Sequence, residues 1–294
     1  AMSLGFLAPL TLAALTLFGT ISRGPSEPPI RASLRIVDVR GAASMVARGA
    51  AVLDARDAAA FAAGHLPGAQ NYAWQKTTGP GTSQGRLRPD LAAIAQMLAA
   101  LGVDSGRPTL LYGAAGLGHG EEGHAAWLLL LLGHPEIAML DGGFASWSAA
   151  GRPVVTATAP PRLGRFEPRT RAEFRAARDD VARAKQVLDV RSTIEFSGAT
   201  PFGESRGGHL PGACHCDWRT LLDEGGRVRP ASRVQRALMD AGIDPQQEIV
   251  TVCTNGLRSA FVTAVLNGRG IPLVRTYDGG LIEWASDPSA PLVR

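Results

Sequence analysis

The sequence predicts an α/β protein made of two similar halves, each a parallel β-sheet flanked by helices. Two observations lead to this prediction. Short apolar runs rich in β-branched residues alternate with segments of helical periodicity, which is typical of a parallel sheet covered on both faces. In addition, several motifs occur twice in the same order, which indicates an internal duplication.

The duplicated motifs match closely in both order and spacing. A Val-Leu-Asp-x-Arg run is followed by Gly-His-Leu-Pro-Gly-Ala, then by a tryptophan nine residues after the histidine, and later by Asp-Gly-Gly with a further tryptophan. The paired positions are 52–56 and 187–191, 64–69 and 208–213, Trp74 and Trp218, 141–143 and 278–280, and Trp147 and Trp284. A duplication of this kind predicts two domains of one architecture.

The chain of 294 residues is long enough for two domains of ordinary size. We expect an apolar N-terminal segment and linker at residues 1–29, a first domain at 30–158 and a second at 159–294. The join lies in the proline-rich segment from Arg152 to Pro168.

In the second half, apolar β-branched runs predict strands near 187–190, 249–252 and 273–276. Helical spacing predicts helices over 231–241, 259–267 and 280–285, with Ser259 as the N-cap of the middle one. In such sheets, functional sites lie beyond the carboxyl ends of the strands.

Cys253 stands at such a position, between a predicted strand and a predicted helix. Backbone N–H groups of a short loop and of a helix N-terminus favour a thiolate there, and so does the cation of Arg258. The alternative is a structural cysteine buried in the core. Gly256, which permits a tight loop, and Arg258 favour the functional interpretation, because neither is needed to pack a core.

Composition excludes several other classes of protein. The formal net charge is only +4 without a long basic block, which argues against a nucleic-acid partner and suits a small anionic substrate. Three cysteines are too few for a disulfide framework, and a Cys214–Cys216 bridge would be strained. The run Cys214–Asp217 lacks a second pair of ligands, so we expect no metal; a resolving thiol for Cys253 stays open as its role.

Residues 4–21 are almost entirely apolar, at the lower limit of length for a membrane-spanning helix. Three interpretations stay open: envelope targeting or anchoring with membrane contact, a helix packed on the body, and an interface helix. A cell-envelope or periplasmic location is favoured over the cytoplasm.

Taken together, the motifs resemble those of the tandem-domain rhodanese (sulfurtransferase) family over nearly all of residues 35–294. The resemblance implies two rhodanese-like domains, of which the first is catalytically silent. Aligning Gly116-Leu117 with Gly256-Leu257 places Gly113 at the position of Cys253, and glycine has no side chain that could act as a nucleophile.

In this family the loop cysteine takes the outer sulfur of a donor such as thiosulfate or 3-mercaptopyruvate. The resulting persulfide passes that sulfur to cyanide, a thiol or a protein cysteine, and no cofactor is implied. Such chemistry needs a thiolate, N–H donors for the sulfur and cations for the leaving anion. The candidates are Cys253 as nucleophile, the loop residues Thr254, Asn255, Gly256, Leu257 and Ser259, and the cations Arg258, Arg206 and Arg191.

Several alternatives remain open. Thr254 and Asn255 match neither the basic pair typical of thiosulfate enzymes nor the glycine-rich loop of mercaptopyruvate enzymes, and thiosulfate is favoured by a narrow margin. Arg191 has a structural alternative, an ion pair with Asp189 or Glu195. A Cys-based phosphatase or arsenate reductase is a remote alternative, because its loop places arginine six positions after cysteine, one more than here.

Other polar residues are expected to be structural. His65 and His209, in identical motifs, should brace loops, and Asp141 and Asp278 should serve in turns and caps. The remaining polar residues around the first half's last long helix are expected at a solvated turn and helix edge: His119, Glu121, Glu122, His124 and His134. The first half on its own also suits a non-catalytic interaction module.

Overall fold

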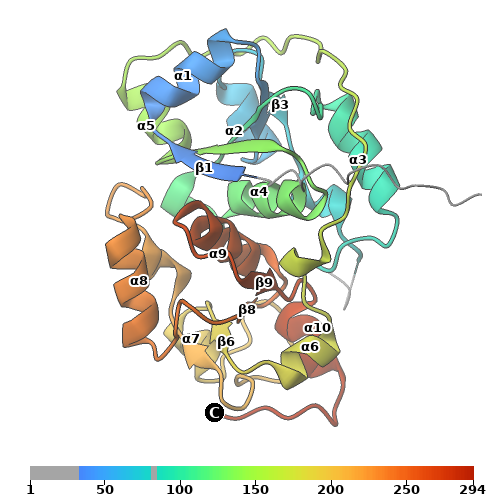
Figure 1. Cartoon of the computed structure of the whole chain (residues 1–294), viewed down its shortest axis with the longest axis vertical. Coiled ribbons are helices and arrows are strands. Elements are labelled where there is room, and N and C mark those ends of the chain that lie inside the picture. The colour runs from blue at the N-terminus through green and yellow to red at the C-terminus, as the bar shows by residue number, and fades with distance from the viewer. Residues whose placement is uncertain (1–32, 81–84) are drawn as a thin grey trace, which may run out of the picture. The chain divides into compact units, whose positions relative to one another are not determined.

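The computed structural model of the chain describes residues 33–80 and 85–294 (Figure 1). It contains two sheets whose strands are all parallel, which confirms the predicted fold class. The first sheet has the order β1-β5-β4-β2-β3, with β1 (Ser33–Val37), β2 (Ala51–Asp54), β3 (Gln70–Asn71), β4 (Thr109–Tyr112) and β5 (Glu136–Leu140). The second has the order β7-β6-β8-β9, with β6 (Val187–Asp189), β7 (Cys214–His215), β8 (Ile249–Val252) and β9 (Val274–Thr276).

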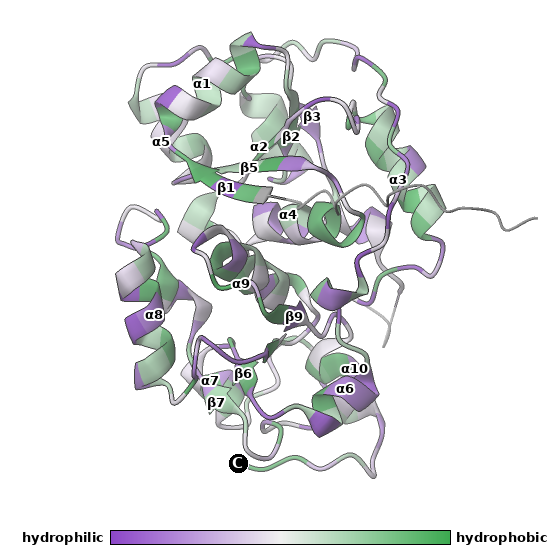
Figure 2. Cartoon of the chain, viewed as in Figure 1, coloured by the Kyte–Doolittle hydropathy of each residue, from purple (hydrophilic) through white to green (hydrophobic). Residues whose placement is uncertain are grey.

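Helices connect the strands in both halves, as the alternating pattern predicts. Aspartates accept a backbone N–H at the starts of α1, α2 and α3, which explains where those helices begin. The helices are α1 (Val39–Ala47), α2 (Ala58–Ala63), α3 (Leu91–Ala100), α4 (Glu121–Leu131), α5 (Gly143–Ala149), α6 (Arg178–Arg183), α7 (Thr193–Phe196), α8 (Ala231–Asp240), α9 (Leu257–Gly268) and α10 (Gly280–Ser286). Figure 2 shows apolar residues along β1 and β5, and both a polar and an apolar face on α8.

The predicted elements of the second half match the observed strands and helices closely, with one correction. Helix α9 begins at Leu257, and its N-cap is Gly256 in the left-handed conformation (φ 83°). Ser259 therefore lies inside the first turn and is not the cap. A glycine accounts for the earlier start, because left-handed backbone is open to it at little cost.

The two halves meet through α4 and α9, which pack against each other at the centre of Figure 1. Nearly every residue of both helices is buried, so neither has a solvent-facing side. A Cβ on Gly123 would collide with Phe261, and one on Gly120 would lie 2.6 Å from the Phe261 Cβ. These glycines let the helices approach closely, and the halves consequently share one core.

The two Asp-Gly-Gly motifs reach across this junction in a reciprocal way. The Asp278 carboxylate accepts the Leu87 backbone N–H at 2.8 Å, and the Asp141 carboxylate accepts that of Val228 at 2.7 Å. Each aspartate therefore binds a loop of the opposite half, a wider role than the predicted local turn. In the same region Gly85 has room for no side chain, because a Cβ there would collide with the carbonyl of Asn255 in the Cys253 loop.

The two motif histidines brace loops in the same manner, as predicted. His65 stacks on Phe61 and bonds to its carbonyl oxygen at 2.9 Å. His209 stacks on Phe196 and bonds to its carbonyl oxygen at 2.9 Å.

Several polar residues of the first half differ from their predicted surroundings. Glu122, His124 and His134 are buried in and after α4 rather than solvated. His124 bonds to the Tyr72 hydroxyl at 3.0 Å, and His134 to the Thr109 hydroxyl at 3.2 Å. The helical pattern does not reveal their burial, because α4 lies between the strands of the first sheet and α9 of the second half.

The first half holds the counterpart of the Cys253 site with different chemistry. Strand β4 ends at Tyr112 and β8 at Val252, so Gly113 does stand opposite Cys253. The loop that follows is longer, however, and the left-handed glycine before the helix is Gly120 (φ 84°) rather than Gly116. Glu122 is the second residue of α4, as Arg258 is the second residue of α9. Its Oε2 occupies the space that a side chain at position 113 would fill.

Residues 4–21, and with them the three interpretations of the apolar segment, lie outside the described residues. Among the helices of 33–80 and 85–294, none combines the length and apolarity needed to cross a membrane. The domain boundaries at 29 and 158 stay predictions.

The buried Glu122 carboxyl gives a prediction about stability. Burial raises the pKa of Glu122 to about 8, aided by the charges of Glu121 and Asp54, and its Oε2 has no partner in the described structure. The folded state therefore keeps this proton up to about pH 8, whereas the unfolded chain loses it near the ordinary value of 4.5. Stability should fall as pH rises between these values, by up to about 1.4 kcal/mol per pH unit.

Glu122→Gln removes this titration. We subtract the free energy of unfolding of the wild type from that of Glu122→Gln, both measured by urea denaturation. This difference should increase by about 3 kcal/mol from pH 5 to pH 8. Glu167→Gln, at an exposed position, is the control and should leave the pH dependence unchanged. The same pH dependence in wild type and Glu122→Gln would contradict the assignment.

Candidate active site

The Cys253 loop is a tight turn whose shape depends on two glycines. A Cβ on Gly256 would lie 2.5 Å from the carbonyl oxygen of Asp278, and one on Gly280 would collide with that of Thr254. Leu281 and Ile282 at the start of α10 donate their N–H groups to the carbonyls of Cys253 and Thr254, at 2.9 and 3.0 Å. Helix α10 therefore holds the loop carbonyls.

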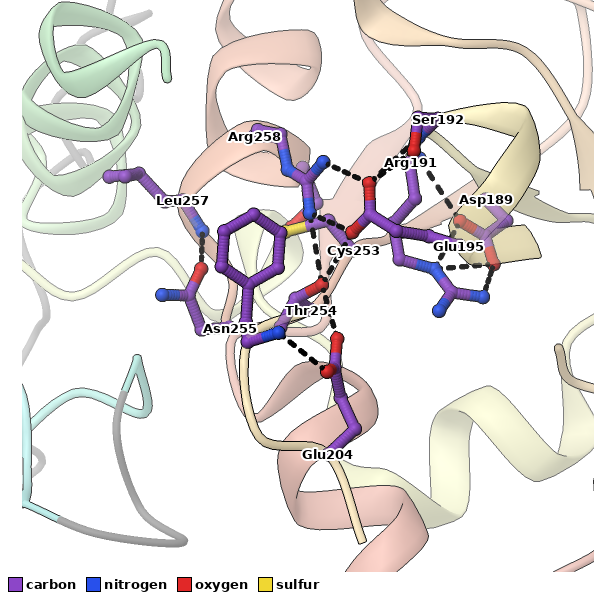
Figure 3. A network of polar contacts seen from close by, with 12 residues as sticks. Asp189, Arg191, Ser192, Glu195, Glu204, Cys253, Thr254, Asn255, Leu257 and Arg258 are labelled. Atoms are coloured by element: carbon purple, nitrogen blue, oxygen red, sulfur yellow. Dashed lines mark hydrogen bonds and ion pairs between the residues drawn. The ribbon is translucent and has the colours of Figure 1, made fainter. Parts of the chain in front are cut away.

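Cys253 lies at the carboxyl end of β8, where the sequence predicts a site, and it is fully buried. Its sulfur is close to the guanidinium of Arg258 and 3.5 Å from the hydroxyl of Ser259 (Figure 3). Leu257, Arg258 and Ser259 are the first residues of α9, and such N–H groups have no carbonyl partner within their helix. The thiol thus lies beside the predicted cation, but it also belongs to the apolar core and is not exposed to solvent, as the structural alternative expects. Its role as nucleophile stays a prediction.

Arg258 is bound on its other side by a buried carboxylate. Its Nη1 and Nη2 donate to the two Glu195 oxygens at 2.8 and 2.6 Å, and Nη2 also donates to the Thr254 hydroxyl at 2.9 Å (Figure 3). Burial disfavours the charged guanidinium, but Glu195 and then Cys253 outweigh burial and raise the pKa of Arg258. Burial likewise acts against the Glu195 carboxylate, yet Arg258 and Ser192 lower the pKa of Glu195 to about 2. Both groups are therefore charged at neutral pH.

A second carboxylate adjoins this pair. The Thr254 hydroxyl lies 3.0 Å from Glu195 Oε1 and 3.1 Å from Glu204 Oε1. Glu204 also accepts the Phe202 backbone N–H at 3.0 Å, and the Phe202 ring stands 5.4 Å from the Arg258 guanidinium. Phe202 and Glu204 belong to the insertion before the second Gly-His-Leu-Pro-Gly-Ala motif, so this insertion extends over the Cys253 loop.

The other two candidate arginines are bound elsewhere. Arg191 is buried and pairs bidentately with Asp189, with a further bond to the Gly208 carbonyl. This matches the structural alternative proposed for it, and Arg56 pairs with Asp54 in the same way in the first half. Arg206 donates to the carbonyls of Ala285 and Asp287. Donor binding by Arg191 and Arg206 stays a prediction.

A cavity of about 260 Å³, here called the loop cavity, opens beside the Cys253 loop. Its floor consists of Thr254, Asn255, Leu257 and Arg258, all predicted site residues. Its walls come from Phe202 and from the first half: Trp74, Gln75, His119 and Glu121. The silent half therefore supplies much of the wall around the candidate nucleophile.

Sequence reasoning missed the residues that surround the predicted loop. Glu195 was considered only as a partner of Arg191, whereas it binds Arg258. The pattern Ser192-x-x-Glu195 is a capping box, and it is a local signal that Glu195 occupies a fixed place at the start of α7. For Phe202, Trp74, His119 and Glu121 the sequence holds no such signal, because only the tertiary fold brings them to the loop.

Comparison with known proteins shows the family of the chain. The Rhodanese-like domain family matches residues 31–150 and 170–287, one copy in each half. A thiosulfate sulfurtransferase of Pseudomonas aeruginosa is 30% identical over 252 residues, covering 82% of this chain and 90% of that protein. The thiosulfate sulfurtransferase of Gallus gallus is 28% identical, covering 82% and 88%. The sulfur carrier protein TtuD of Thermus thermophilus is 29% identical, covering 79% and 86%.

Solved structures share the fold. An anaerobic ergothioneine biosynthesis enzyme from Chlorobium limicola, in complex with trimethyl histidine, superimposes with a TM-score of 0.78 at 21% identity, covering 88% of this chain and 69% of that one. With one family match in each half, and with the paired motifs on corresponding strands and loops, the chain belongs to the rhodanese family as a tandem of two rhodanese-like domains.

Proposed function

We propose that this chain is a sulfurtransferase that moves a sulfane sulfur from a donor such as thiosulfate to a thiophilic acceptor such as cyanide or a thiol, through a persulfide on Cys253. The observation that carries the proposal is the position of the Cys253 sulfur, at the start of α9 and beside both Arg258 and Ser259. The names of the sulfurtransferase relatives support it.

The reaction has two displacement steps. The Cys253 thiolate attacks the outer sulfur of thiosulfate, the donor S–S bond breaks, and its electron pair leaves with sulfite. The acceptor then attacks the outer sulfur of the Cys253 persulfide, and the electron pair of that S–S bond returns to Cys253. Arg258, although paired with Glu195, lies beside the negative charge, and the Ser259 hydroxyl is 3.5 Å from the sulfur that carries it. We expect the N–H groups at the start of α9 to stabilise the transferred sulfur as well.

Access to the thiol requires movement. Cys253 has no exposed surface, so a donor reaches its sulfur only when side chains beside the loop cavity shift. Phe202 is the wall residue whose movement we propose, because the residue is 49% exposed and its ring stands 5.4 Å from the Arg258 guanidinium.

A second candidate donor is 3-mercaptopyruvate, and one observation favours it. Arg258 already binds Glu195 bidentately, so the loop offers no unpaired guanidinium to a dianion such as thiosulfate. A monoanionic donor needs less compensation, because each charge moved into a partly buried site loses hydration. The names of the relatives and the charge of the site thus favour different donors.

The first prediction about function concerns the persulfide itself. We expect the protein to gain the mass of one sulfur after incubation with thiosulfate or 3-mercaptopyruvate, and Cys253→Ser to gain none, as measured by intact-mass spectrometry. Cys214→Ser is the matched control and should still take up sulfur. Absence of the adduct with both donors, together with Cys253-dependent hydrolysis of p-nitrophenyl phosphate, would overturn the proposal in favour of a phosphatase.

The donor is decided by steady-state thiocyanate production from each of the two donors with cyanide. If the Arg258–Glu195 pair determines donor choice, kcat/KM for 3-mercaptopyruvate exceeds that for thiosulfate in the wild type. In Glu195→Gln, which leaves the Arg258 guanidinium unpaired, the ratio of kcat/KM for thiosulfate to kcat/KM for 3-mercaptopyruvate should rise. An unchanged ratio in Glu195→Gln would contradict the charge argument.

The same pair should contribute to stability. Removing one partner of a buried ion pair leaves the other charge unpaired, and we expect Glu195→Gln to lower the free energy of unfolding by about 3 kcal/mol. Because the folded pKa of Glu195 is lowered, the contribution of the pair is present above pH 4.5 and declines as pH falls toward 2. Urea denaturation at pH 7 and pH 3.5 measures both effects.

The matched control for stability is Glu173→Gln, because Glu173 pairs with Arg171 at the surface and its side chain is 59% exposed. That variant should change stability by less than about 1 kcal/mol. Equal effects of the two substitutions would show that the buried pair is not the stronger one.

A further inference from the structure

The loop cavity is bounded by both halves, and its floor is the Cys253 loop. This floor is formed by residues that follow Cys253 in its loop: Thr254, Asn255, Leu257 and Arg258. Cys253 itself is buried and does not line the cavity, so a molecule there lies beside the nucleophile loop and reaches the sulfur through the same movement that a donor requires. The cavity volume of about 260 Å³ is below the roughly 300–1,000 Å³ of most ligand pockets. The occupant is therefore small.

The charge around the cavity is negative. Of the described residues lining it, Arg258 is the only arginine or lysine, and Glu195 balances its charge. Glu204 adds a carboxylate behind Thr254. Glu121 adds another on the wall, where it accepts only the His119 backbone N–H at 2.9 Å and lies 3.8 Å from the His119 ring. Three carboxylates and one guanidinium thus stand in or next to the cavity lining, and this balance favours a cation over an anion of the same size.

Apart from Glu121 and Gln75, the wall residues carry aromatic rings. Trp74 comes from the first half and Phe202 from the insertion, and His119 meets the Phe202 ring edge-on with centroids 6.4 Å apart. Aromatic faces beside a carboxylate are the means by which proteins bind ammonium groups, since the ring quadrupole attracts a cation and the ring also buries its methyl or methylene groups.

We propose that the loop cavity binds the sulfur acceptor, and that this acceptor is a small thiol carrying an ammonium group. The proposal depends on the sulfurtransferase function proposed above and specifies its acceptor. Glu121 and Trp74 are its specificity-determining residues, with the ammonium group between them and the thiol directed at the floor.

The transfer step balances without a further reactant. The acceptor thiolate attacks the outer sulfur of the Cys253 persulfide, a new S–S bond forms, and the S–S bond to Cys253 breaks. Cys253 keeps that electron pair as a thiolate, and the acceptor leaves as a persulfide that carries the proton of the outer sulfur. No group is oxidised or reduced overall, because one sulfane sulfur moves from one thiol to another.

The experiment separates loading from transfer. Cys253 is first loaded with inorganic polysulfide, excess donor is removed, and intact mass confirms the persulfide. Single-turnover loss of the extra sulfur is then followed with four thiols: cysteamine and thiocholine, which are cationic, 2-mercaptoethanol, which is neutral, and 3-mercaptopropionate, which is anionic. The intrinsic reactivity of each thiol cancels when the rate constant of a variant is divided by that of the wild type.

We expect Glu121→Gln to lower the rate constants for the two cationic thiols about fivefold relative to that for 3-mercaptopropionate, the size of one partly exposed ion pair. Glu121→Lys should enlarge this change, and Trp74→Leu should reduce the rate constant for thiocholine most. Glu167→Gln removes the same charge from an exposed position outside the cavity and should change none of the ratios. Unchanged ratios in Glu121→Gln and Trp74→Leu would overturn the proposal.

A binding measurement tests the cavity independently of sulfur transfer. In Cys253→Ser, choline should quench tryptophan fluorescence, and the quenching should be lost in Trp74→Phe and weakened about fivefold in Glu121→Gln. If no persulfide forms but choline binds in this way, the proposed function fails while the cation site stands. If the persulfide forms but choline does not bind and the thiol ratios are unchanged, the function stands and the acceptor proposal fails.

Discussion

The buried ion pair between Arg258 and Glu195 is the interaction on which the site depends. The guanidinium holds the start of α9, the carboxylate holds the start of α7, and Thr254 joins both through its hydroxyl. The pair therefore ties the Cys253 loop to the segment after β6. A charge this deep is stable only with its partner, so neither residue can change alone without cost. The same pairing decides what Arg258 can offer a substrate, since a neutralised guanidinium attracts an anion less strongly than a free one.

The two halves show how one frame holds different chemistry. Each has an arginine two residues after a strand-end aspartate, a histidine stacked on an aromatic ring, and a left-handed glycine before a buried helix. These features fix backbone geometry and are retained in both. The chemistry of the loop differs at two positions: Gly113 and Glu122 occupy the places that Cys253 and Arg258 hold in the second half. A carboxyl group replaces both the nucleophile and its cation, which removes the chemistry while the space stays filled.

Much of this fold is predictable from the sequence because its determinants are local. The strands at 187–189 and 249–252 follow from β-branched runs, and the duplicated motifs predict two similar sheets. The loop around Cys253 is predictable for the same reason, since a strand, a glycine and a helix follow one another directly. The charge of the site is not predictable in this way, because Glu195 and Glu204 lie 63 and 54 residues before Arg258. Only the tertiary fold brings Glu195 to Arg258 and Glu204 to the Thr254 hydroxyl. Burial of His124 and His134 escapes prediction likewise, because their partners Tyr72 and Thr109 are distant in sequence and meet them only in the folded first half.

The silent half is part of the site in a physical sense. The Asp278 carboxylate holds a loop of the first half at Leu87, and Asp278 also packs against Gly256 beneath the nucleophile loop. Gly85 touches Asn255 from the other side, so the first half confines the Cys253 loop directly. Trp74, which follows β3, and Glu121, the first residue of α4, complete the wall of the loop cavity. The first half, which has a glycine at the position that corresponds to Cys253, thus constrains the Cys253 loop and supplies charged and aromatic side chains to the cavity beside it.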